Sequence, residues 1–162
     1  MKFLYLVRHA KSSRDDPNLP DTARPLNDRG LRDAARMGDR LAKQDVKPDI
    51  LLCSPAVRAL ATAKIIAERL DYKAEEIVVD ERLYAATPDR MLEVVRGLGE
   101  KPKCVMLVGH NPEVAALAHH WSATISEMPT CAVAEFAFDA KSWSNIGEQA
   151  PIKVTLQYPK SR

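Results

Sequence analysis

Four short apolar runs, each followed by a turn and a helical pattern, constrain the fold of this chain more than any other feature. The runs are residues 3–7, 50–53, 77–79 and 104–108. They are rich in β-branched residues and have no helical period, as expected for strands covered on both faces of a parallel sheet. The segments that follow have apolar residues three and four positions apart, which predicts helices over 28–44, 54–70, 89–98 and 112–121.

Capping residues mark where these helices should begin. Asn27 is a plausible cap for the first helix, whose apolar positions begin at Leu31. The pairs Ser54-Pro55, Thr87-Pro88 and Asn111-Pro112 each place a capping side chain before a proline that suits the first helical position. Residues 132–138 and 152–158 have no helix between them, so we expect them to finish the sheet as edge strands, as an antiparallel pair. From Pro159 onward we expect the chain to fray.

Composition sets the broad class. With 162 residues, 46% of them hydrophobic and 28% charged, the chain is expected to form one domain over residues 1–162 of a soluble globular type. The net charge of +2 gives no overall field suited to nucleic acid or an acidic membrane. Three widely spaced cysteines and the lack of a long apolar run predict a cytoplasmic protein in a reducing compartment. We expect a monomer.

Basic and imidazole side chains follow three of the apolar runs. Arg8 and His9 end the first run, Arg58 lies in the first turn after the second, and His110 follows the fourth. Glu81 follows the third run and leaves the same edge if that strand is parallel. The carboxyl ends of parallel strands are where ligands bind, and paired guanidiniums bind phosphate oxygens through two hydrogen bonds each. The sequence therefore predicts a site for a small, doubly charged, tetrahedral anion, and phosphate fits best.

Other kinds of site fit less well. The histidines and Glu81 could be metal ligands, but two arginines would repel a divalent cation and no ligand motif is present, so we expect no metal and no cofactor. The lack of nucleotide-loop, dinucleotide and nucleophile-elbow motifs argues against an NTPase, a dinucleotide enzyme and a serine hydrolase. Ser12 and Asp15 could line the phosphate pocket or only satisfy loop backbone. His119 and His120 point in different directions on a helix, so they are poor joint ligands.

Three segments resemble the signatures of the histidine phosphatase superfamily, also called the phosphoglycerate mutase-like fold. They read LVRHA at 6–10, CSPAVRA at 53–59 and VGHNP at 108–112, and RPLN at 24–27 with Arg29-Gly30 adds a similarity to its small bacterial branch, the SixA-type phosphohistidine phosphatases. Ala10 departs from the glycine of most of the superfamily, although the small branch is similar there. The resemblance implies a three-layer α/β/α fold with a mostly parallel sheet of about six strands.

The resemblance also implies roles for individual residues. His9 would be the nucleophile, Arg8 and Arg58 would hold the phosphoryl oxygens, and His110 would complete the pocket. The segment from Glu81 to Tyr84 looks like the one that carries the proton donor in the mutases and larger phosphatases, which makes Glu81 the candidate acid.

The substrate class follows from size and leaving group. One helix and one strand fill the segment between Arg82 and Val108, which leaves no room for a lid, so an open pocket could admit a phosphorylated side chain on a folded protein. We therefore expect a protein phosphohistidine phosphatase that forms a covalent intermediate on His9 and acts on a phosphorelay or phosphotransfer domain in signal transduction. The alternatives are a broad small-molecule phosphomonoesterase and a phosphoprotein-binding module without turnover.

Overall fold

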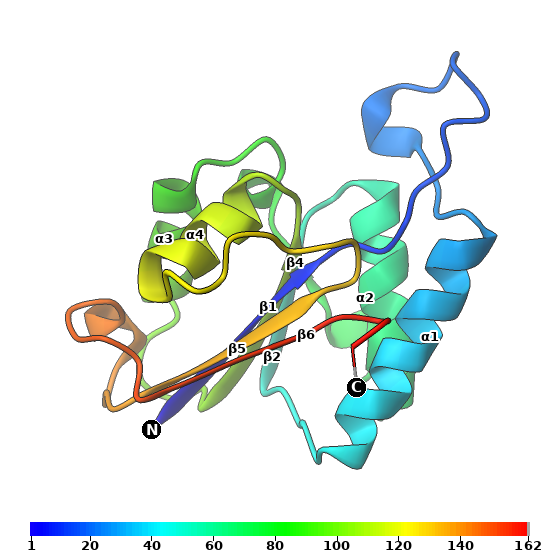
Figure 1. The fold of residues 1–162 in the computed structure, drawn as a ribbon. Helices are drawn as coiled ribbons and strands as arrows, with labels where there is room; N and C mark the ends of the chain where they lie inside the picture. Colours follow the sequence, from blue (N-terminus) through cyan, green and yellow to red (C-terminus); the bar gives the residue numbers. More distant parts are fainter. Residues whose placement is uncertain (162) are drawn as a thin grey trace.

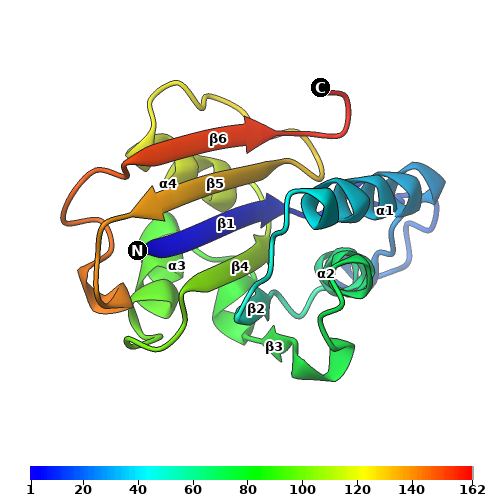
Figure 2. The same cartoon turned by 90° about the horizontal axis from the view of Figure 1, so that it is seen from below.

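A six-stranded sheet with the order β3-β2-β4-β1-β5-β6 forms the centre of the protein (Figures 1 and 2). This computed structural model describes residues 1–161. The strands are β1 (Lys2–Arg8), β2 (Ile50–Cys53), β3 (Val78–Val79), β4 (Cys104–Gly109), β5 (Val133–Phe138) and β6 (Lys153–Gln157). β1 pairs with β4, β4 with β2 and β2 with β3, all in parallel, and β5 is antiparallel to both β1 and β6. The predicted α/β class and mostly parallel sheet are confirmed.

Four α-helices cover the two faces of the sheet. They are α1 (Asp28–Lys43), α2 (Val57–Arg69), α3 (Pro88–Arg96) and α4 (Glu113–Trp121). α1 and α2 lie on one face and α3 and α4 on the other, which confirms the three-layer arrangement (Figure 1). Alternate residues of β1 enter the two cores: Leu4 and Leu6 pack with α3 and α4, and Tyr5 and Val7 pack with α1 and α2. β1 is therefore buried on both faces, as its unbroken apolar run predicts.

Two details of the predicted helices are wrong. Leu31 is 47% exposed, because the buried stripe of α1 passes through Gly30, Ala34 and Met37 instead. α2 begins at Val57 and has no side-chain cap, because the hydroxyl group of Ser54 is buried beside His110 and accepts a hydrogen bond from the amide of Ala56 within the turn.

The other helix starts are close to their predicted positions. Asn27 caps α1 by accepting a hydrogen bond from the amide of Gly30, and Thr87 caps α3 in the same way. α4 begins at Glu113, two residues after the predicted capping residue Asn111, whose side-chain oxygen accepts a hydrogen bond from the amide of Ala115. The polar residue before each of these helices is thus used locally, as its type suggests.

The last two strands form the predicted antiparallel pair, although only β6 lies at the edge of the sheet. β5 pairs along the whole free side of β1 and is therefore an interior strand. Beyond β6, Arg40 donates hydrogen bonds to the carbonyl oxygens of Tyr158 and Pro159. The expected fraying from Pro159 stays a prediction, and Arg162 lies outside the described residues. Over residues 1–161, no helix is both long and apolar enough to cross a membrane.

Gly30 allows the start of α1 to pack directly on the chain that leaves β1. A Cβ atom at this position would lie 2.1 Å from the carbonyl oxygen of Lys11, which is backbone and cannot rotate away. The same carbonyl accepts a hydrogen bond from the amide of Asn27, so the two segments are joined at this point. Gly30 therefore fixes the entry of α1 next to the carboxyl end of β1.

We predict that Gly30→Ala destabilises the protein by about 2 kcal/mol or more, as overpacking does, although alanine is the better helix former. Gly97→Ala is the matched control, because Gly97 has a right-handed helical conformation and a Cβ atom there would meet nothing closer than 3.5 Å. Urea unfolding of the two variants measures the difference. Equal free energies of unfolding for the two variants would show that α1 and the chain after β1 can move apart without loss of stability.

Candidate active site

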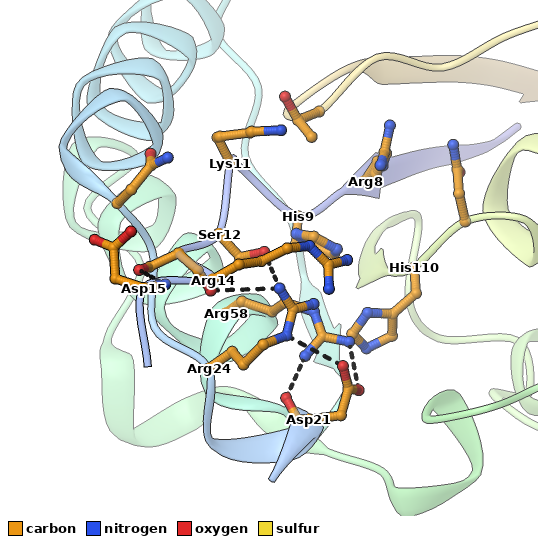
Figure 3. Close-up of a pocket in the computed structure, with 14 residues that line it drawn as sticks. Arg8, His9, Lys11, Ser12, Arg14, Asp15, Asp21, Arg24, Arg58 and His110 are labelled. Carbon is orange, nitrogen blue, oxygen red and sulfur yellow. Dashed lines mark hydrogen bonds and ion pairs between the residues drawn. The ribbon is translucent and has the colours of Figure 1, made fainter. Parts of the chain in front are cut away.

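The parallel strands bring the predicted basic and imidazole residues to one edge of the sheet. Arg8 lies opposite Gly109 in the register of β1 and β4, and Cys53 lies opposite Val108 in that of β2 and β4. A cavity of about 530 Å³ opens at this edge (Figure 3). It is lined by Arg8, His9, Lys11, Ser12, Ser13, Arg14, Asp15, Asp21, Arg24, Asn27, Arg58, His110, Asn111 and Thr130.

His9 is held rigidly and kept neutral. Its side chain is buried, and its Nδ1 lies 2.7 Å from the carbonyl oxygen of Ala10, which places the ring proton on Nδ1 and leaves the lone pair on Nε2. Thr62 supports this turn from α2, because its hydroxyl group accepts from the amide of Ala10 and donates to the carbonyl of Arg58. Burial lowers the pKa of His9 to about 3, and the neighbouring His110 and Arg58 contribute to the decrease. A neutral imidazole with a free Nε2 is a nucleophile.

His110 faces His9 across the cavity, with 5.1 Å between the ring centroids. Its Nε2 lies 2.8 Å from the hydroxyl oxygen of Ser54. That oxygen also accepts from the amide of Ala56, and where its own proton is donated to Nε2 the proton of the imidazole lies on Nδ1. Burial lowers the pKa of His110 to about 4, helped by the charge of Arg58. Both histidines are therefore neutral near pH 7.

Two guanidiniums, the half-buried Arg8 and the buried Arg58, supply positive charge to the site. Arg58 is only 6% exposed, and Arg8 donates one hydrogen bond to the carbonyl oxygen of Met128. Among the described residues, the Nε atoms of Arg8 and Arg58 and the Nδ1 of His110 are buried without a hydrogen-bond partner. Buried donors are almost always paired in native proteins, so three free donors beside one cavity indicate a site that a small anion completes.

The loop before α1 supplies polar groups that the sequence analysis did not single out. Asp21 begins the short 3-10 helix η1 (Asp21–Ala23) and contacts Arg58 through its carboxylate at 2.9 Å and its carbonyl oxygen at 2.7 Å (Figure 3). Tyr84 donates a hydrogen bond to the same carboxylate at 2.6 Å, and Arg24 contacts it at 3.2 Å. These interactions, led by the hydrogen bond from Tyr84, hold the pKa of Asp21 well below its usual range. The carboxylate is therefore ionised.

No periodic signal marks residues 11–27, which explains why Asp21 was missed. The only cue in the sequence is Arg24, which lies in the segment RPLN that resembles the SixA-type branch. Arg24 donates to the hydroxyl group of Ser12 at 3.0 Å and so ties the loop to the strand end.

The remaining predicted residues are divided between the cavity and the surface. Ser12 and Asp15 line the cavity, although Asp15 lies on the side away from His9 (Figure 3). Glu81 lies on the short 3-10 helix η3 (Glu81–Leu83), exposed and outside the cavity lining. His119 and His120 are exposed on α4, also outside the lining. Within residues 1–161, no group of three or more His, Cys, Asp or Glu side chains is placed to hold a metal ion.

Comparisons with known proteins agree with this arrangement. Residues 4–85 match the model of the histidine phosphatase superfamily (branch 1). An uncharacterized protein of Mycobacterium tuberculosis is 37% identical over 112 residues, which cover 69% of this chain and 67% of the relative. The crystal structure of a SixA protein from Agrobacterium tumefaciens is 30% identical and has a TM-score of 0.75, over 83% of this chain and 91% of that one. A structure of the protein histidine phosphatase SixA complexed with tungstate shares the fold, with 22% identity, a TM-score of 0.79 and 97% of each chain covered.

The low pKa values of the two histidines predict that the free energy of unfolding decreases as the pH is lowered. Unfolded histidine takes up a proton near pH 6.5, whereas His110 does so near 4 and His9 near 3 in the folded protein. Between these values the unfolded state binds more protons, so lowering the pH from 7 to 5 should cost about 2 kcal/mol for each histidine. The free energy of unfolding, measured with urea at both pH values, should therefore decrease less in His9→Gln and in His110→Gln than in the wild type, by about 2 kcal/mol in each variant. An unchanged dependence would contradict the burial argument.

Proposed function

Because the chain belongs to the histidine phosphatase superfamily, we propose that it is a phosphatase that removes the phosphoryl group from phosphohistidine on a protein, through a covalent intermediate on His9. The neutral His9, the free donors of Arg8 and Arg58, and His110 lie on one cavity, which supports phosphoryl transfer to an imidazole. Resemblance to SixA proteins supports the substrate class. We expect the substrate to be a phosphorelay or phosphotransfer protein of a signalling system.

The lack of a suitable proton donor is the observation that carries the choice of substrate. Among the residues that line the cavity, the carboxylate nearest the site is Asp21, which Tyr84 and Arg58 keep ionised. Glu81 lies outside the lining, and Asp15 lies away from His9. An alkoxide leaving group needs a proton from a general acid, whereas an imidazole can carry its own. The site therefore suits phosphohistidine better than an alkyl phosphate.

The chemistry proceeds in two steps. Nε2 of His9 attacks phosphorus in line, so that a P–N bond to His9 forms while the P–N bond of the substrate breaks and its imidazole leaves. The guanidiniums of Arg8 and Arg58 and the Nδ1–H group of His110 stabilise the charge on the equatorial oxygens. Water then attacks the phosphoryl group of His9, the P–N bond breaks, and inorganic phosphate leaves. Because the arginines supply the positive charge, we propose that neither step needs a metal ion.

We predict that His9→Ala abolishes turnover while phosphate still binds, because both arginines remain. Brief reaction of the wild-type protein with radiolabelled phosphohistidine, followed by denaturation, should trap an acid-labile and base-stable label on His9. A label on another residue, or turnover by His9→Ala, would exclude the covalent mechanism.

Wild-type activity should persist in EDTA, because the arginines supply the positive charge. Loss of activity in EDTA with recovery on addition of zinc or manganese would exclude the metal-free mechanism.

Another prediction concerns the leaving group. In single-turnover measurements of phosphoryl transfer, the wild-type protein should act on phosphohistidine and on p-nitrophenyl phosphate at least about 10²-fold faster than on an alkyl phosphate, the factor typical of a missing general acid. Glu81→Gln should change none of the three rates, because the side chain lies outside the cavity. A selective loss on the alkyl phosphate in this variant would restore Glu81 as the acid and favour a broad small-molecule phosphomonoesterase.

A further inference from the structure

One face of α1 carries a row of positive charges. Arg29, Arg32, Arg36 and Lys43 are all exposed, and at about 100° per residue they span roughly 60° of the helix circumference. We refer to these four residues as the basic face. Because the whole protein has a net charge of only +2, the row is a local concentration of charge and not a reflection of the composition.

The basic face is poorly neutralised within the protein. Arg29 forms an ion pair with Asp33 at 3.4 Å, but over residues 1–161 Arg32, Arg36 and Lys43 form none. Arg32 lies three residues after Arg29 and four before Arg36, and like charges at these spacings oppose helix formation. Asp28 lies four residues before Arg32 and Asp39 four before Lys43, but neither forms an ion pair with the basic face, so Arg32, Arg36 and Lys43 stay available to a partner outside the chain.

The face is hollowed, and the helix that carries it begins beside the candidate active site. A shallow groove of about 580 Å³ is lined by Arg32, Ala35, Arg36, Asp39, Arg40 and Lys43. Asn27, which caps α1, lines the cavity of His9. With a rise of about 1.5 Å per residue, the basic face begins about 3 Å along the axis from this cap and ends about 24 Å from it. A protein with a phosphohistidine in the cavity would contact this face if its surface extended along α1 over this distance.

We propose that the basic face docks the phosphoprotein substrate, through carboxylate side chains on the surface that surrounds its phosphohistidine. This inference rests on the proposed function. Arginine binds carboxylates through two parallel hydrogen bonds, and the face is as long as a helix of about 14 residues. Asp28 and Asp39 lie on the same side of α1, and Asp39 is paired with Arg69. This mixture of signs suits a protein surface better than a uniformly anionic membrane.

Synthetic substrates can test this proposal. One peptide is a helix of about 20 residues with a phosphohistidine near its start and glutamates on the same face, and its partner has glutamine at those positions. We expect Arg32→Glu combined with Arg36→Glu to lower kcat/KM at least about 10-fold for the glutamate peptide, and less at high salt. The glutamine peptide and free phosphohistidine should be hydrolysed as by the wild type. The control pair Lys101→Glu and Lys103→Glu reverses two exposed charges at the amino end of β4, the opposite edge of the sheet.

The outcomes separate the two proposals. If the wild type hydrolyses free phosphohistidine but the charge reversal has no effect on the glutamate peptide, or if the control pair has an equal effect, docking on α1 is excluded and the proposed function stands. If the wild type hydrolyses neither peptide and no free phosphohistidine, the proposed function fails and this inference fails with it. Binding of phosphatidylserine vesicles that the charge reversal abolishes, with unchanged peptide kinetics, would assign the face to a membrane. Circular dichroism checks that each variant is folded.

Discussion

The parallel pairing of β1 with β4 is the interaction on which the site depends. Its register sets Arg8 opposite Gly109, so the residues that follow, His9 and His110, emerge side by side. A slip of one residue would turn Arg8 and every apolar side chain of β1 to the other face of the sheet. Burial of β1 on both faces makes such a slip costly, because Leu4 and Leu6 fill one core and Tyr5 and Val7 the other. The hydrophobic core thus sets the geometry of a polar site.

Burial has opposite consequences for the two kinds of base at this edge. An imidazole can avoid the cost of a buried charge by losing its proton, and His9 and His110 both do so. A guanidinium keeps its proton, so Arg8 and Arg58 remain charged and need acceptors. Arg58 finds one in Asp21, whereas Arg8 has a carbonyl oxygen. The result is a neutral nucleophile, His9, and a neutral hydrogen-bond donor, His110, beside two fixed cations.

The sequence predicted best the elements that a pattern of apolar residues specifies. β1, β2 and β4 and the residues directly after them could be located because a buried strand leaves an unbroken apolar run, whereas both residues of β3 are exposed. A strand end places Arg8 and His110 without reference to the rest of the chain. Asp21 and Tyr84 could not be located, because an aperiodic loop is positioned only by the contacts it makes, here with Arg58. Ser54 was predicted as a helix cap because its type fits that role, but a neighbouring histidine from another strand competes for the same hydroxyl group.

A phosphoryl group that binds Arg58 must first displace the carboxylate of Asp21. This carboxylate contacts Arg58, which an incoming phosphoryl group also needs. Arg58 is almost fully buried, whereas the side chain of Asp21 is 51% exposed and lies on a loop. Asp21 can turn toward water and stay hydrated, although it would lose its contacts with Tyr84 and Arg24, whereas Arg58 cannot move without leaving a buried charge unpaired. The exchange would replace a single carboxylate by a dianion with more acceptor oxygens, which a guanidinium binds more strongly.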